Sequence, residues 1–148
     1  MFRKILAATG GSPWSRNAVA TAIQLAASCH GALLIVHVLE DDPQFQPLAA
    51  AGTDPQLRQQ MEATGQRILA HAVQQATQAG LTPEALATWG SIPEQIVRIA
   101  ASTGCDLIVM GTRHLTGGKR LMTGRICNAV IATAPCPVLV VPLAQEAC

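Results

Sequence analysis

Short apolar runs alternate along the chain with segments in which apolar residues recur every three or four positions. The runs are typical of strands covered on both faces of a sheet, and the spaced segments are typical of helices. Strands are predicted at residues 5–8, 33–39, 86–89, 106–110 and 138–141, and helices between them at 13–30, 55–79, 92–103 and 126–133. Because parallel neighbours need crossover connections, this alternation predicts an α/β fold with a doubly wound, five-stranded parallel sheet and helices on both faces.

Local residue patterns predict where two of these helices begin and where one ends. Ser12 followed by Pro13 predicts the start of the first helix, because serine caps a helix N-terminus and proline suits the first turn. Gly31 is expected to end that helix. Ser91 and Glu94 form an S-x-x-E pattern, which predicts a capping box at the third helix.

The loops after the first and fourth strands are the candidate ligand-binding segments. In doubly wound sheets, ligands bind beyond the carboxyl ends of the strands, where the strand order reverses. The corresponding residues are 9–12 and 111–125, and the second segment holds four glycines and four of the ten Lys and Arg residues. Glycine lets backbone N–H groups approach a phosphate, and a helix N-terminus adds positive potential. The second loop is therefore a candidate phosphate site, with a flexible basic surface loop as the alternative.

Known phosphate-binding motifs are incomplete in both loops. Residues 116–119 are similar to part of a Walker A motif, but the G-x-x-x-x-G-K-[ST] spacing is absent. Residues 9–12 resemble the Ser-Gly-Gly-x-Asp-Ser loop of ATP pyrophosphatases, but the acidic residue is missing. A tight strand-to-helix turn is the preferred interpretation of that segment.

The histidines and cysteines show no spacing that predicts a metal site or a catalytic group. His37 lies inside an apolar strand and is expected to be a hydrogen-bonded core residue, whereas His71 is expected on a helix surface. The five cysteines are scattered without a CxxC pair, which argues against a disulfide framework and against a zinc site. No Ser-His-Asp or Cys-His-Asn set can be assembled. We therefore expect neither catalytic residues nor a metal, and a protein that is not an enzyme.

Composition and charge exclude several function classes. The 148 residues are 49% hydrophobic and 13% charged, so a packed domain is expected rather than a disordered chain. A formal net charge of +1 and 3% aromatic residues argue against a nucleic-acid partner. No apolar run reaches the roughly 18 residues of a membrane span, and the N-terminal apolar stretch is too short for a signal peptide. A cytoplasmic protein that contacts neither nucleic acid nor membrane is the prediction.

Residues spread over the whole chain resemble the universal stress protein A family. The matching segments are 4–6, 11–12, Ala18, 34–38, 106–111, Gly124 and 134–141. The resemblance implies a stress-response protein with a single domain over residues 1–148 and a sheet in the order 3-2-1-4-5. It also implies a homodimer in which the last strand, from Val138 to Val141, pairs across the two-fold axis. Such pairing covers an apolar edge strand that is otherwise open to aggregation.

The same resemblance places a nucleotide site, because some members of the family bind ATP. Those members carry Gly, two residues, Gly, nine residues, Gly and then Ser or Thr, together with an Asp after the first strand. The resemblance assigns the first and third glycines to Gly111 and Gly124. Backbone or apolar contacts to the nucleotide are assigned to Ala8, Thr9, Val38, Met110 and Ile126.

Three polar positions of this motif differ in the chain. His114 stands where the second glycine is usual, Arg125 where Ser or Thr is usual, and Gly10 where Asp is usual. A side chain at 114 obstructs backbone approach to a phosphate. Gly10 removes an acceptor for the adenosine end, and Arg125 replaces a hydroxyl donor by a cation at a helix N-terminus, where a positive charge is unfavourable.

Two interpretations of these changes remain open. In the first, the motif is degraded, ATP with Mg binds weakly or not at all, and the protein acts through an unidentified protein partner. Slow ATP hydrolysis is then the most enzymatic activity that we expect. In the second, Arg113 and Arg125 hold a phosphate-bearing ligand at the helix N-terminus, since arginine binds phosphate bidentately. That protein would be a nucleotide or phosphate-anion sensor.

Overall fold

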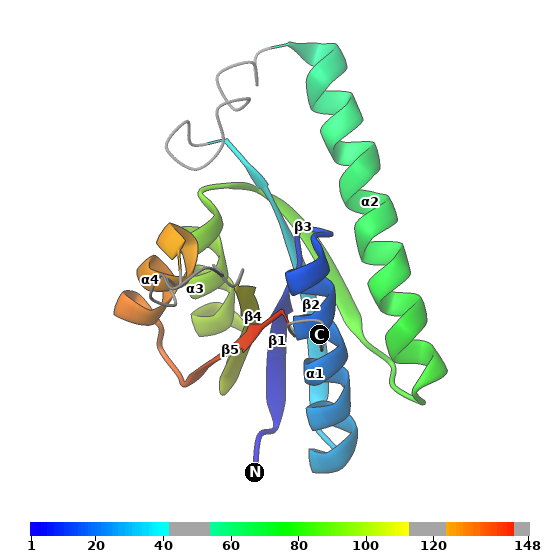
Figure 1. The fold of residues 1–148 in the computed structure, drawn as a ribbon, viewed down its shortest axis with the longest axis vertical. Coiled ribbons are helices and arrows are strands. Elements are labelled where there is room, and N and C mark those ends of the chain that lie inside the picture. The colour runs from blue at the N-terminus through cyan, green and yellow to red at the C-terminus, as the bar shows by residue number, and fades with distance from the viewer. Residues whose placement is uncertain (42–53, 113–123, 144–148) are drawn as a thin grey trace, which may run out of the picture.

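The computed structural model describes residues 1–41, 54–112 and 124–143, and its elements alternate between strand and helix throughout (Figure 1). The strands are β1 (Lys4–Ala8), β2 (Ala32–Glu40), β3 (Glu84–Gly90), β4 (Leu107–Thr112) and β5 (Val138–Pro142). The helices are α1 (Pro13–Cys29), α2 (Pro55–Gln78), α3 (Ile92–Thr103) and α4 (Gly124–Thr133). All strand pairs are parallel, in the order β3-β2-β1-β4-β5. The predicted doubly wound sheet and its strand order are confirmed.

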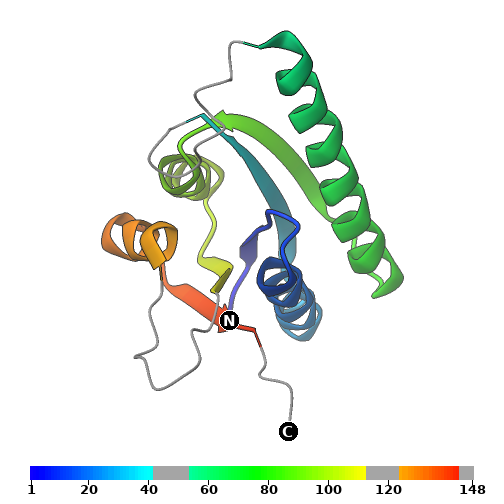
Figure 2. The ribbon, with the colours of Figure 1, turned by 45° about the horizontal axis from the view of Figure 1, so that its top comes forward.

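Two helices cover each face of the sheet (Figure 2). Successive side chains of a strand point to opposite faces, so Ile5 and Ala7 pack with α1 and α2, whereas Leu6 packs with α3 and α4. The three central strands are buried on both sides, which explains why their sequences are apolar without alternation. None of the helices formed by the described residues is both long enough and apolar enough to cross a membrane.

Most strand boundaries differ from the predicted ones by one or two residues, and three of the differences from the predicted boundaries bear on the loops and turns. Strand β4 continues through Gly111 and Thr112, because the backbone at these residues still pairs with β5. Helix α4 begins at Gly124 rather than at residue 126. The residue in left-handed conformation at the end of α1 is His30, with φ of 53°, and not Gly31. Glycine is required at position 31 for another reason, because a Cβ there would lie 2.7 Å from the carbonyl oxygen of Phe2.

The predicted capping box at α3 is wrong. Ser91 is the N-cap residue, but its side chain makes no cap hydrogen bond. The Glu40 carboxylate takes that role, because its Oε2 accepts a hydrogen bond of 2.7 Å from the backbone N–H of Ile92. Glu40 is only 1% exposed. A buried carboxylate at the end of β2 is thus held by the positive end of a helix that begins 52 residues later.

Asp106 fastens the amino end of the sheet in a similar way. Its carboxylate accepts hydrogen bonds from the backbone N–H groups of Arg3, at 2.8 Å, and Lys4, at 3.0 Å. The backbone N–H of Asp106 donates in turn to the carbonyl oxygen of Lys4 at 2.9 Å. The hydrogen bond from Arg3 lowers the pKa of Asp106 below its ordinary value, the bond from Lys4 acts in the same direction, and partial desolvation opposes them.

We predict that Asp106→Asn lowers the free energy of unfolding at neutral pH by about 1 kcal/mol, because backbone donors lose a charged acceptor that solvent partly screens. The folded pKa of Asp106 lies below the unfolded one. The ionised carboxylate therefore stabilises the protein above a pH of about 4, and this contribution is lost as the pH falls through the folded pKa. Urea unfolding as a function of pH should show a steeper acid loss for the unchanged protein than for Asp106→Asn. Glu84→Gln, at an exposed carboxylate, is the control; identical pH profiles for the two variants would contradict the prediction.

Candidate functional site

The turn between β1 and α1 is built from short polar side chains that bond to one another. Ser12 caps α1, as predicted, and accepts a hydrogen bond of 3.2 Å from the N–H of Ser15. The buried Ser15 hydroxyl also lies 2.9 Å from the Ser12 hydroxyl and accepts from the N–H of Gly10 at 3.3 Å. Gly11 has φ of +82°, which favours glycine. The turn at the carboxyl end of β1 is therefore held by its own residues.

His37 on β2 links this turn to the neighbouring strand by a hydrogen bond. It is 8% exposed, and its Nδ1 lies 2.9 Å from the carbonyl oxygen of Thr9. Helix α2 closes over the ring at Gly65, where a Cβ would lie 2.8 Å from Cδ2 of His37. The prediction of a hydrogen-bonded core histidine is confirmed.

The residues expected to give apolar contacts to a nucleotide lie together. Val38 and Met110 belong to the buried cluster between the sheet and helices α3 and α4, and Ala8 and Ile126 pack against the same cluster. All four are near the carboxyl ends of strands or the start of α4. The structure thus brings together, on the α3/α4 face, four residues that are far apart in sequence.

The described polar positions lie at the end of β1 and at the start of α4. Thr9 is buried at the end of β1, and Gly10 is exposed, with no atom within 4 Å of the position that a Cβ would occupy. Gly124 and Arg125, expected just before α4, form its first turn instead, and both are exposed. Arg113 and His114 lie outside the described residues.

Gly111 has a structural role that the sequence pattern does not reveal. It lies within β4, paired with Val141, and a Cβ on it would overlap the carbonyl oxygen of Trp14 in the first turn of α1. The same Cβ would lie 2.9 Å from the backbone nitrogen of Ser15. Helix α1 can therefore pack this closely against β4 only if residue 111 is glycine. The expectation that Gly111 follows the strand is wrong, because its backbone still pairs with Val141 of β5.

The cysteines near the site are thiols in apolar surroundings. Burial raises the pKa of Cys127, and its Sγ donates to the carbonyl oxygen of Gly111 at 3.4 Å. Burial also raises the pKa of Cys136. A raised pKa disfavours the reactive thiolate at neutral pH. Within the part of the chain that the structure describes, no three His, Cys, Asp or Glu residues are arranged to hold a metal ion.

Comparison with known proteins identifies this arrangement. The profile of the Universal stress protein family matches residues 1–142. The chain belongs to the universal stress protein family. A universal stress protein from Thermus aquaticus, encoded in the QAH/OAS sulfhydrylase 3′ region, is 37% identical over 142 residues, which cover 95% of this chain and 99% of the relative.

Solved structures of universal stress proteins share the fold. One is a universal stress protein in complex with cAMP, with a TM-score of 0.70, 23% identity, and coverage of 97% of this chain and 98% of the other. Another is the universal stress protein from Archaeoglobus fulgidus in complex with dAMP, with a TM-score of 0.69, 18% identity, and coverage of 95% and 98%. These likenesses establish the universal stress protein fold for the chain.

We predict that Gly111→Ala lowers the free energy of unfolding by about 2–3 kcal/mol, because the added methyl group forces α1 away from β4. Gly10→Ala is the matched control, since its Cβ enters open space at a residue without positive φ. Its effect should stay within about 0.5 kcal/mol. Urea unfolding of both variants without any nucleotide tests this. Equal stability of the two variants would show that Gly111 is not required for packing.

Proposed function

We propose that this universal stress protein is a dimeric stress-response protein whose nucleotide cleft binds ATP weakly or not at all, and that it acts through contacts with another protein. We place the proposed cleft beside Ala8, Val38, Met110 and Ile126, the four apolar residues that lie together on the α3/α4 face. One observation carries the proposal. The apolar positions of the family's ATP motif are retained in this chain, whereas Gly10, His114 and Arg125 replace the usual Asp, Gly and Ser or Thr.

The change at Gly10 removes an acceptor without filling the space. Because no atom lies within 4 Å of a Cβ at this position, an aspartate would fit there. Its absence therefore weakens nucleotide binding through a lost hydrogen bond and not through a distorted turn. A hydrogen bond from a ligand to a charged group is worth about 1.5–3 kcal/mol, or roughly tenfold to a hundredfold in affinity.

Arg125 supports the second candidate function, a nucleotide or phosphate-anion sensor. It lies in the first turn of α4, where the helix favours negative charge. A phosphate at this position would be attracted by both the guanidinium and the N-terminal N–H groups. The complexes of related proteins with cAMP and dAMP are consistent with a phosphate-bearing ligand in this fold.

We predict that the triple variant Gly10→Asp, His114→Gly, Arg125→Ser binds Mg-ATP at least tenfold more tightly than the unchanged protein, because it regains an acceptor, backbone access and a hydroxyl. Isothermal titration calorimetry of nucleotide-stripped protein measures this, with ADP, AMP and inorganic phosphate as comparisons. No gain by the triple variant would mean that the three changes do not limit binding.

The unchanged protein in the same titrations separates the two candidates. No heat with any ligand supports the protein-contact function, and binding of phosphate-bearing ligands regardless of the base supports the anion sensor. Micromolar, ATP-selective binding would contradict the proposal of a degraded motif.

The proposed dimer rests on the outer edge of β5. This strand pairs with β4 on one side, and its sequence is apolar. Leu139 is 37% exposed on it, and Ile131 on the adjacent α4 is 50% exposed. An unpaired apolar edge favours pairing with the same strand of a second copy.

We predict that Leu139→Lys converts the dimer to a monomer, because a charged side chain on an edge strand opposes strand pairing. Leu86→Lys is the matched control, since Leu86 is 39% exposed on β3, the opposite edge of the sheet. Sedimentation equilibrium should show a loss of dimer only for the β5 variant. A dimer that survives Leu139→Lys and dissociates with Leu86→Lys would place the interface at β3.

We also propose that the chain acts as one domain over residues 1–148 in the cytoplasm, with a protein partner and without nucleic-acid or membrane contacts. We propose that its catalytic activity is at most slow hydrolysis of Mg-ATP, because Gly10 stands where ATP-binding members of the family carry Asp.

A further inference from the structure

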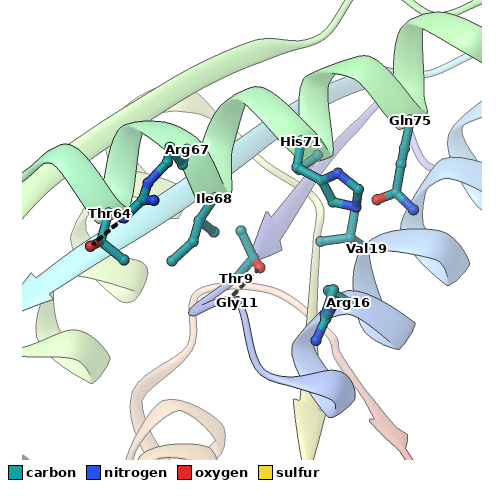
Figure 3. A pocket seen from close by; sticks show the side chains of 10 residues that line it. Thr9, Gly11, Arg16, Val19, Thr64, Arg67, Ile68, His71 and Gln75 are labelled. Atoms are coloured by element: carbon teal, nitrogen blue, oxygen red, sulfur yellow. Dashed lines mark hydrogen bonds between the residues drawn. The ribbon is translucent and has the colours of Figure 1, made fainter.

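A cavity of about 320 Å³ lies between α1 and α2, on the face of the sheet opposite to the nucleotide cleft (Figure 3). Val19 from α1 and Ile68 and Ala72 from α2 form its apolar walls, and Thr9 and Gly11 close one end. The volume is at the lower end of the range for small-molecule sites. Its walls are apolar and rigid, since Val19 and Ala72 are part of the buried core.

Positively charged and polar side chains surround the mouth of this cavity. Arg16 extends from α1, and Arg67 and His71 extend from α2 (Figure 3). Arg67 donates a hydrogen bond of 3.3 Å to Thr64 Oγ1, one turn earlier on the same helix. The residues that line the cavity include no Asp or Glu. Among the described residues, neither Arg16 nor Arg67 forms an ion pair with a carboxylate. The cavity therefore favours an anion.

Gln75 adds a buried acceptor that lacks a hydrogen bond. Its side chain points from α2 toward α1, into the cavity (Figure 3). Its Oε1 is buried and has no hydrogen-bond partner among the described residues. A buried polar atom without a partner costs free energy, so natural structures seldom keep one without a reason. A ligand N–H or O–H group would satisfy it.

We propose that this cavity binds a small organic anion with an apolar body and a hydrogen-bond donor. Arg16 and Arg67 attract the anionic group to the mouth of the cavity, the apolar body packs on Ile68 and Ala72, and the donor reaches Oε1 of Gln75. The site differs from the proposed nucleotide cleft, because Val38 and Met110 belong to the other face of the sheet, although Thr9 at the end of β1 adjoins both.

Anilinonaphthalene sulfonate is a suitable probe, since it combines a sulfonate, an aromatic body and an N–H group, and its fluorescence rises in apolar surroundings. We predict saturable binding of one probe molecule per chain to the full-length protein. Arg67→Gln should weaken binding about tenfold, because a charge-assisted contact is lost. Arg98→Gln on α3 is the matched control: like Arg67, Arg98 bonds to a residue three positions earlier, Gln95, but on the opposite face.

Gln75→Leu provides a second variant with two opposite expected effects. It should weaken probe binding severalfold by removing the acceptor, and it should raise the urea midpoint of the free protein by removing a buried atom without a partner. A variant that is only destabilised would instead lower both the affinity for the probe and the urea midpoint.

Three results would overturn the proposal. They are the absence of a saturable site, equal binding by the Arg67→Gln and Arg98→Gln variants, and a loss of binding with Arg125→Gln but not with Arg67→Gln. The last result would place the probe in the nucleotide cleft. Failure of ATP to bind leaves this proposal standing, because the two sites occupy different faces of the sheet.

Discussion

The contact between the first turn of α1 and strand β4 is the constraint on which the carboxyl edge of the sheet depends. The carbonyl oxygen of Trp14 occupies the space that a side chain at 111 would need. This close packing brings Ser15 into the β1–α1 turn, where its hydroxyl bonds with Ser12 and with the N–H of Gly10. The turn then presents Thr9 and Gly10 at the end of β1, beside the cleft.

This constraint changes how the glycine motif is interpreted. In a phosphate loop, glycine is kept because the backbone approaches a ligand. Gly111 is needed for helix packing whether or not a ligand binds, so its presence says little about ATP. The informative positions are those at which a different side chain would not disturb the helix packing. A Cβ on Gly10 would enter open space, and Arg125 is exposed at the start of α4, so these two positions bear on the proposed ligand more directly than Gly111 does.

Much of the fold could be predicted from the sequence, because burial on both faces makes the strands apolar and the crossovers make the helices periodic. Contacts between distant residues could not. Glu40 looks like a surface residue at the end of an apolar run, yet it is buried and caps a helix more than fifty residues later in the chain. The local S-x-x-E pattern at Ser91 predicted the wrong capping group. A buried carboxylate without hydrogen bonds costs more free energy than a serine hydroxyl does, so Glu40 accepts from the helix N-terminus.

The two faces of the sheet carry positive charge in different ways, and this decides how each candidate site can be tested. On the α3/α4 face, Arg125 lies in the first turn of α4, so a phosphate in the proposed site would meet the guanidinium together with the N-terminal N–H groups of the helix. On the α1/α2 face, Arg16 lies in the first turn of α1 and Arg67 lies near the middle of α2, and the buried residues of both helices pack on the sheet. Sequence reasoning found only the first site, because a glycine-rich loop is a local pattern. The second is formed by side chains of two helices, and only the packing of α2 against α1 makes Arg67, Gln75 and Arg16 neighbours.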